Sequence, residues 1–244
     1  YKNLIAKEYE KHKIILESNQ ILESEKEIFR NIMEQRADQN VYLNSIRTLS
    51  DILAKYYEKN VIILIDEYDV PLENAYHEGF YDDMTNLIRS CFESALKTNP
   101  SLEFAVLTGC LRVSRESIFT GLNNLKTYSI TKNKFSQYFG FTQEEMQEIL
   151  QTFSLEQYAE TIAKWYDGYR FGLTEIYNPW SVLNCIDSYL QNDMVACEPY
   201  WSNTSSNRIV KRLIEESNER TKSMVEELIN GTPIHTQIFE DVTY

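Results

Sequence analysis

The sequence of 244 residues is poor in glycine, and none of its glycines belongs to a phosphate-binding loop. There are seven: Gly79, Gly109, Gly121, Gly140, Gly168, Gly172 and Gly231. None is followed by lysine. The loop that cradles nucleotide phosphates, G-x-x-x-x-G-K-[S/T], requires a Gly-Lys pair. The sequence therefore excludes such a loop from this chain.

Cysteine is also scarce, and long apolar runs are missing. The four cysteines, Cys91, Cys110, Cys185 and Cys197, form no C-x-x-C pair and have no histidine at zinc-ligand spacing. We expect four reduced thiols. No window approaches the ~18 apolar residues of a membrane span, and no signal-peptide pattern is present. We therefore predict a cytoplasmic location and no membrane contact.

Basic residues are outnumbered by acidic ones. The 24 Lys and Arg against 37 Asp and Glu give a formal charge of -13. Such a chain repels phosphate backbones, so we expect no direct nucleic-acid binding by this segment, although a local basic patch is compatible with the composition. With 43% hydrophobic and 13% aromatic residues, the chain can bury a sizeable core.

The most apolar stretch, "VIILI" at Val61–Ile65, has no polar alternation, which predicts a strand buried on both faces of a parallel sheet. A helix is expected over about Tyr81–Lys97, ended by "NP". The stretch "EFAVLTG", Glu103–Gly109, predicts a second buried strand. Strand, helix and strand form a βαβ unit with parallel strands.

Other local signals mark further elements. Residues 1–58 have the apolar spacing of helices. Capping-box patterns begin at Ser24 in "SEKE" and at Thr142 in "TQEE". Asn178, followed by proline, caps another helix. A short strand is expected at "TYSIT", Thr127–Thr131.

Candidate catalytic groups follow the two predicted strands. Ligands of parallel sheets bind outside the carboxyl ends of the strands, where Asp66, Glu67 and Thr108 fall. Asp66 could hold Mg²⁺, and Glu67 could act as general base on an attacking water. The Thr108 hydroxyl could sense a terminal phosphate, and Arg112 could neutralise developing charge.

Structural explanations compete with each of these roles. A buried strand must return to water, and Asp or Glu is an ordinary way to do so. A hydroxyl such as that of Thr108 often only satisfies a turn, and Arg112 and Arg115 could be ion-paired surface residues.

Aromatic residues are concentrated in "WYDGYRFG" and "IYNPWSVLN". Tyr166, Tyr169, Phe171, Tyr177 and Trp180 could form a stacking surface for a base or a peptide. We favour the alternative, a small satellite core packed against a helix.

Long motifs resemble a known family. "IDEYDVPLENAYHEGFYDDM", "VLTGCLRVSRESIFTGLNNL", "SQYFGFTQEEM", "WYDGYRFG" and "IYNPWSVLN" are similar to those of the AAA-ATPase-like family of bacterial proteins. The resemblance covers about Tyr9 to Trp201.

The resemblance implies an α/β fold, a partial P-loop NTPase core of parallel strands with flanking helices, followed by a mostly helical region. We expect residues 1–138 to form the NTPase part with its N-terminal helices, and 139–244 a helical lid-like region. The family's Walker B pair matches Asp66 and Glu67, and its sensor position matches Thr108. Arg112 lies in the matching "LRVS" loop.

In the family, the Walker A loop precedes the segment that corresponds to Tyr1, and many members carry a nuclease-like domain of the PD-(D/E)XK type after Tyr244. We therefore expect this chain to be a fragment. The parent would bind and hydrolyse ATP with Mg²⁺, whereas the fragment alone would be inactive. We expect the parent to have a further partner, either another protein or the nuclease-like domain in cis. The alternative is a non-catalytic interaction module that has inherited NTPase architecture.

Overall fold

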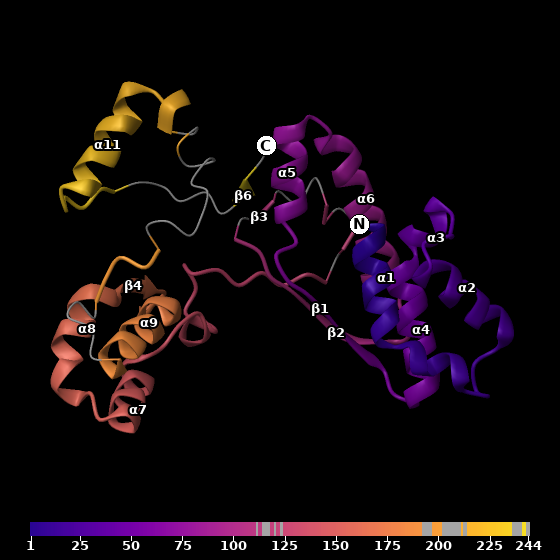
Figure 1. The fold of residues 1–244 in the computed structure, drawn as a ribbon. Helices are drawn as coiled ribbons and strands as arrows, with labels where there is room; N and C mark the ends of the chain where they lie inside the picture. The colour runs from indigo at the N-terminus through magenta and orange to yellow at the C-terminus, as the bar shows by residue number, and fades with distance from the viewer. Residues whose placement is uncertain are drawn as a thin grey trace. The chain divides into compact units, whose positions relative to one another are not determined.

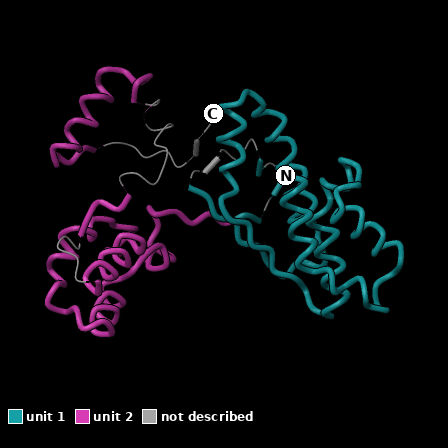
Figure 2. Tube along the Cα trace, viewed as in Figure 1, with its two compact units in different colours: residues 1–125, 237–244 teal, residues 126–236 magenta. Residues whose placement is uncertain are grey.

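The structure, a computed structural model, divides into two compact units (Figure 2). It describes residues 1–110, 112–113, 118–119, 121–122, 124–191, 197–201, 211, 214–235 and 241–242. Unit 1 comprises residues 1–125 and 237–244, and unit 2 comprises residues 126–236. The predicted domains 1–138 and 139–244 stay a prediction, because packing units need not coincide with domains.

Unit 1 combines helices with a small parallel sheet (Figure 1). Its elements are α1 (Lys2–Lys11), η1 (Lys13–Glu17), α2 (Glu23–Met33), α3 (Gln39–Leu43), α4 (Ser45–Tyr57), β1 (Val61–Ile65), α5 (Val70–Glu78), α6 (Tyr81–Leu96), β2 (Leu102–Leu107), β3 (Arg112–Val113) and β6 (Asp241–Val242). The chain thus combines helices with parallel strands, as the predicted α/β class requires.

The N-terminal helices share one buried core. The rings of Tyr9 and Phe29 lie 4.7 Å apart between centroids, and both side chains are almost fully buried. The hydroxyl of Tyr9 donates to the Ser45 carbonyl at 2.7 Å, and that of Tyr42 donates to the Ile32 carbonyl at 3.1 Å. These bonds satisfy the polar tips that burial would otherwise leave unpaired.

Helix α2 starts earlier than its capping pattern predicts. The N-cap is Leu22 instead of Ser24, and the Glu25 carboxylate accepts the Leu22 N–H at 3.0 Å. A glutamate at the third helical position thus satisfies one free N–H without a hydroxyl at the cap. The predicted capping box at Ser24 is therefore wrong.

The predicted βαβ unit is present. β1 and β2 pair in parallel, with Ile62 opposite Phe104 and Ile65 opposite Leu107. α5 and α6 form the crossover, and α6 ends one residue before the predicted Lys97. The Asn99 side chain then donates to the Ala95 carbonyl at 2.9 Å, which closes the helix end.

The sheet is buried on one face only. Ile62, Leu64, Phe104 and Val106 are exposed, and Leu64 retains 74% of its accessible surface. The expectation of burial on both faces is therefore wrong for this chain. The reason is that no element among the described residues covers that face, whereas Ile65 and Leu107 pack into the core below α5 and α6.

Unit 2 is a helical cluster with a β-hairpin. Its elements are η2 (Ser136–Tyr138), α7 (Gln143–Phe153), η3 (Glu156–Tyr158), α8 (Ala159–Tyr166), β4 (Asp167–Phe171), β5 (Thr174–Tyr177), α9 (Pro179–Leu190) and α11 (Glu219–Ile229). Both helix starts predicted here are confirmed. Thr142 Oγ1 accepts the Glu145 N–H at 3.3 Å, and Asn178 Oδ1 accepts the Ser181 N–H at 3.0 Å.

The strand predicted at Thr127–Thr131 is not formed. This segment is irregular, and the Ile130 carbonyl accepts a hydrogen bond from the Gly172 N–H at 2.8 Å. A strand needs a neighbouring strand to pair with. Among the described residues, this segment instead contacts the turn of the β4–β5 hairpin.

Two of the four thiols are not free. Cys185 and Cys197 are joined by a disulfide, with their Cα atoms 5.0 Å apart, whereas Cys91 and Cys110 are free. The expectation of four reduced thiols is therefore wrong. Both joined residues belong to the buried core of unit 2, where α9 brings Cys185 against the segment after it. No helix in the described part of the chain is long and apolar enough to cross a membrane.

Replacing Leu72 with Ala should reduce the free energy of unfolding by about 2–5 kcal/mol, because Leu72 is fully buried in the core below the sheet. Leu64→Ala is the matched control and should change it by less than about 0.5 kcal/mol, because Leu64 is mostly in water. Urea denaturation followed by circular dichroism measures both. Equal losses would mean that the open face is covered in solution.

Thr142→Ala should cost about 1 kcal/mol, because it removes the acceptor for the Glu145 N–H at the start of α7. Thr152→Ala changes the same residue type inside that helix, where the hydroxyl only donates to the Glu148 carbonyl at 2.8 Å. It should be neutral or slightly stabilising, since alanine favours helix. The order of the two melting temperatures tests this, and a reversed order would contradict the cap.

Candidate active site at the sheet edge

The candidate site lies where β1 and β2 end side by side. The ladder continues past the strands, since the Thr108 N–H donates to the Ile65 carbonyl at 2.9 Å and the Tyr68 N–H donates to the Thr108 carbonyl at 3.0 Å. These bonds hold the residues after each strand at the same edge of the sheet. Asp66, Glu67 and Thr108 are exposed there.

Three groups converge on this edge through hydrogen bonds. The Thr108 hydroxyl donates to Asp66 Oδ1. The Glu67 N–H donates to the same Oδ1 at 3.1 Å and to Thr108 Oγ1 at 3.4 Å. The structure thus brings Asp66, Glu67 and Thr108 together, and neither carboxylate is drawn into separate apolar packing.

The backbone at Glu67 is unusual. Its φ is 51°, in the left-handed region that residues with a side chain seldom adopt. Such a conformation costs about 1–3 kcal/mol and persists only where its surroundings hold it. Here the two hydrogen bonds from its N–H fix the turn.

Gly109 is required by close packing behind the edge. A Cβ on this residue would lie 2.7 Å from Asp69 Oδ1 and 2.8 Å from Tyr68 Cε1. Both distances are below normal contact, so only glycine fits. Asp69 and Tyr68 are buried, and Tyr68 stacks edge-on against Phe119 with ring centroids 5.2 Å apart. The exposed carboxylates thus lie above a layer that contains the buried Tyr68 and Asp69.

The electrostatic field at the edge is negative. Desolvation raises the pKa of the Cys110 thiol, and the nearby carboxylates of Asp69, Glu67, Glu73 and Asp66 raise it further. A negative charge on the sulfur is disfavoured by the same field that would attract a cation. Cys110 itself is therefore a poor nucleophile.

The donor set at this edge fits Mg²⁺. Within the described residues, no three His, Cys, Asp or Glu side chains form a ready cation cage. Mg²⁺ seldom uses one, since it keeps several waters and binds through one or two carboxylates together with substrate phosphates. Asp66 Oδ1 takes both hydrogen bonds found at that carboxylate, which leaves Oδ2 for a cation.

The other two predicted residues lie partly or wholly outside the described part of the structure. Arg112 belongs to β3, which pairs in parallel with β6, but its side chain lies outside the described part of the structure. Arg115 lies outside the described residues as well. Sequence reasoning missed Gly109 and Cys110. The signal for Gly109 was its place directly after Thr108, where a side chain has little room.

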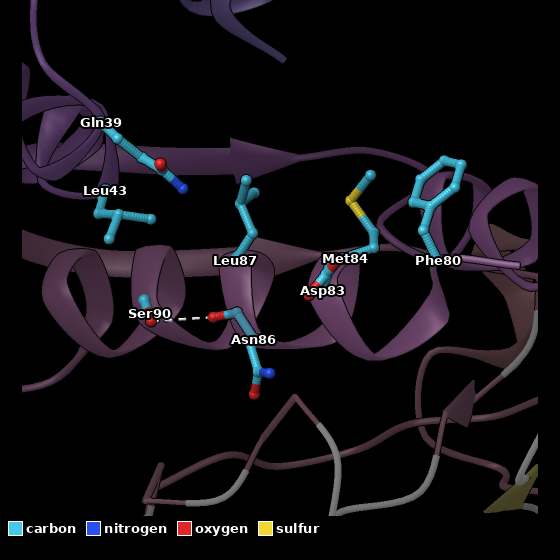
Figure 3. Close-up of a pocket in the computed structure, with 8 residues that line it drawn as sticks. All are labelled: Gln39, Leu43, Phe80, Asp83, Met84, Asn86, Leu87 and Ser90. Carbon is cyan, nitrogen blue, oxygen red and sulfur yellow. Dashed lines mark hydrogen bonds between the residues drawn. The ribbon is translucent and has the colours of Figure 1, made fainter.

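A cavity described in unit 1 does not include these residues. It has a volume of about 520 Å³ and lies between α3 and α6 (Figure 3). Its lining consists of Gln39, Leu43, Phe80, Asp83, Met84, Asn86, Leu87 and Ser90. The Ser90 hydroxyl donates to the Asn86 carbonyl at 2.8 Å within the helix. The lining has a single carboxylate, that of Asp83, and therefore offers no pair of converging acid and base, so the sheet edge is the better candidate.

Comparison with known proteins supplies a family. Residues 3–119 match a family profile described as Predicted AAA-ATPase. The chain is also similar to an uncharacterized protein in the vnfD 5' region of Azotobacter chroococcum mcd 1, with 26% identity over 167 residues. That alignment covers 68% of this chain and 31% of the relative, so the chain spans well under half of that protein. No solved structure matches.

The matched residues include β1, the crossover helices, β2 and the whole hydrogen-bonded edge. The match therefore supports an AAA-ATPase-like family for the part of the chain that carries the candidate site.

Proposed function

We propose that the protein carrying this chain is a Mg²⁺-dependent ATPase with Asp66 and Glu67 as its Walker B pair. The observation that carries the proposal is the double hydrogen bond to Asp66 Oδ1 at the end of two parallel strands. The family match supports it. β1 and β2 would belong to a P-loop core whose phosphate-binding loop is contributed by a part of the protein other than these residues.

Asp66 is suited to hold the cation. The bonds from the Thr108 hydroxyl and the Glu67 N–H hold Oδ1 in place, and Oδ2 would then bind the cation. Bound Mg²⁺ would supply charge neutralisation to the phosphate oxygens of ATP. Thr108 acts in this proposal as a positioning residue, since its hydroxyl hydrogen is already given to Asp66.

Glu67 is the candidate general base. The residue is exposed at the edge, where its backbone N–H is bonded to the oxygen atoms of Asp66 and Thr108. There it can orient a water and accept its proton as the water oxygen attacks phosphorus. The left-handed backbone sets the direction of the side chain independently of the strand. Arg112 stays a candidate for stabilising the charge that develops on the leaving phosphate.

Glu67→Gln in the intact protein should lower kcat for ATP by at least about 100-fold while the KM changes little, because glutamine cannot take the proton. Glu78→Gln at the far end of α5 is the matched control, and its turnover should equal that of the wild type. Phosphate release measures both.

Unchanged turnover in Glu67→Gln would remove this residue from the proposed role. Absence of Mg-ATP affinity in isothermal titration of the intact protein would instead support a non-catalytic interaction module.

Thr108→Val should raise the Mg²⁺ concentration for half-maximal turnover by about tenfold, because Asp66 loses the hydroxyl that orients it. Thr108→Ser keeps the hydroxyl and should behave like the wild type. A Mg²⁺ titration at saturating ATP compares the three proteins. If the Ser variant were impaired and the Val variant were not, the methyl contact rather than the hydrogen bond would matter.

A further inference from the structure

Unit 2 contains a segment whose charge differs from that of the rest of the chain. From residue 126, where unit 2 begins, to residue 143 the sequence has no Asp or Glu, although the whole chain carries -13. The same stretch contains Lys126, Lys132 and Lys134, all exposed, together with many aromatic residues. A polyanion that the chain as a whole repels would meet a locally positive surface here.

This segment is held in place by the β4–β5 hairpin. The Gly172 N–H donates to the Ile130 carbonyl at 2.8 Å, and the hydroxyls of Ser136 and Thr174 share a hydrogen bond of 2.8 Å. A Cβ on Gly172 would lie 2.8 Å from the Lys132 carbonyl oxygen, which shows how closely the two backbones approach. The segment and the hairpin therefore form one surface.

Five aromatic rings of this surface are left in water. The exposed side chains are Tyr128, Phe135, Tyr138, Phe139 and Tyr169, and Tyr138 retains 74% of its accessible surface. Their neighbours in the same motifs, Tyr166 and Tyr177, are buried in the core of unit 2. The expected satellite core is thus right for those two. An exposed apolar cluster of this kind marks an interaction site more often than single exposed residues do.

The rings contact one another and a cation. The centroids of Tyr128 and Phe135 lie 4.8 Å apart, and those of Phe135 and Tyr138 lie 6.2 Å apart. Lys134 Nζ lies 5.2 Å from the Tyr128 ring centroid and 4.9 Å from that of Phe135. A positive charge is therefore held beside the rings on the exposed surface.

The second group of rings lies on the hairpin side. Phe139 packs edge-on against Phe171 at 5.8 Å between centroids, and Tyr169 lies 6.1 Å from Phe171. The strand pair adds no positive charge, because Arg170 and Glu175 stand opposite each other in the register and Asp167 contributes a further carboxylate. The net positive charge of the surface thus comes from the lysines of the preceding segment.

We propose that this surface, formed by residues 126–139 and the β4–β5 hairpin, binds single-stranded nucleic acid. Exposed rings offer stacking platforms to unpaired bases of any sequence, and lysines beside them neutralise backbone phosphates. An acidic peptide could use the lysines but would leave the flat ring faces without a matching group. The expectation that this chain contacts no nucleic acid came from its total charge, which does not describe this surface.

The test is fluorescence anisotropy with the whole chain and a labelled oligo-dT of about twelve nucleotides at low salt, a length within the range of one such surface. Tyr138→Ala combined with Tyr169→Ala should weaken binding by at least about fivefold, since stacking platforms are lost. The double Tyr→Phe variant keeps the rings and should bind like the wild type. Tyr57→Ala, which removes an exposed ring from α4, is the control and should have no effect.

Lys134→Gln should reduce the slope of log affinity against log salt by about 0.7, the contribution of one phosphate contact to a single strand. The proposal would be overturned if the oligonucleotide did not bind at low salt, or if the Tyr→Ala pair left its binding intact. It would also be overturned if a poly-glutamate peptide displaced the oligonucleotide and the peptide's own binding were lost in the Tyr→Ala pair. Circular dichroism of each variant separates a lost surface from a lost fold.

Discussion

The parallel pairing of β1 with β2 is the constraint on which the candidate site depends. The two strands are far apart in sequence, and only the α5–α6 crossover brings their ends together. Once paired, the ladder bonds beyond Ile65 leave no freedom in where Asp66 and Thr108 stand. The chemistry of the edge is thus a property of the sheet register. A slip of one residue would turn Asp66 to the opposite face of the sheet.

The same pairing explains why Gly109 and the strained backbone of Glu67 occur together. The chain turns away from the sheet immediately after the strands, over the buried Tyr68 and Asp69. Close approach of the two turns leaves no room for a side chain on one of them. On the other, the hydrogen bonds to Asp66 and Thr108 compensate for an unfavourable φ. Rigidity here is what a cation site with few protein ligands needs.

Sequence patterns predicted the features of the fold that depend on neighbouring residues in the chain. Three predictions agree with the structure because each depends on residues close in the chain. They are the strand at Val61–Ile65, the end of α6 near "NP" and the cap of α9 at Asn178. The nearness of Asp66 and Thr108 also followed, since the βαβ rule fixes strand direction.

The predictions that were wrong concern features that depend on residues distant in the chain. The apolar run of β1 does not reveal which of its faces is covered, and "TYSIT" has the composition of a strand without a strand beside it. The Cys185–Cys197 pair required the packing of unit 2. The net charge of the chain likewise did not reveal the positive surface around Lys134. That surface is formed because the segment folds onto the hairpin.

The open face of the β1–β2 sheet has a thermodynamic consequence. Side chains such as Leu64 and Phe104 are hydrated before and after the chain unfolds, so they add little to the increase in heat capacity on unfolding. The dependence of stability on denaturant concentration scales with the same newly exposed area. This part of the protein should therefore have a flatter stability curve and a broader unfolding transition than its number of residues suggests.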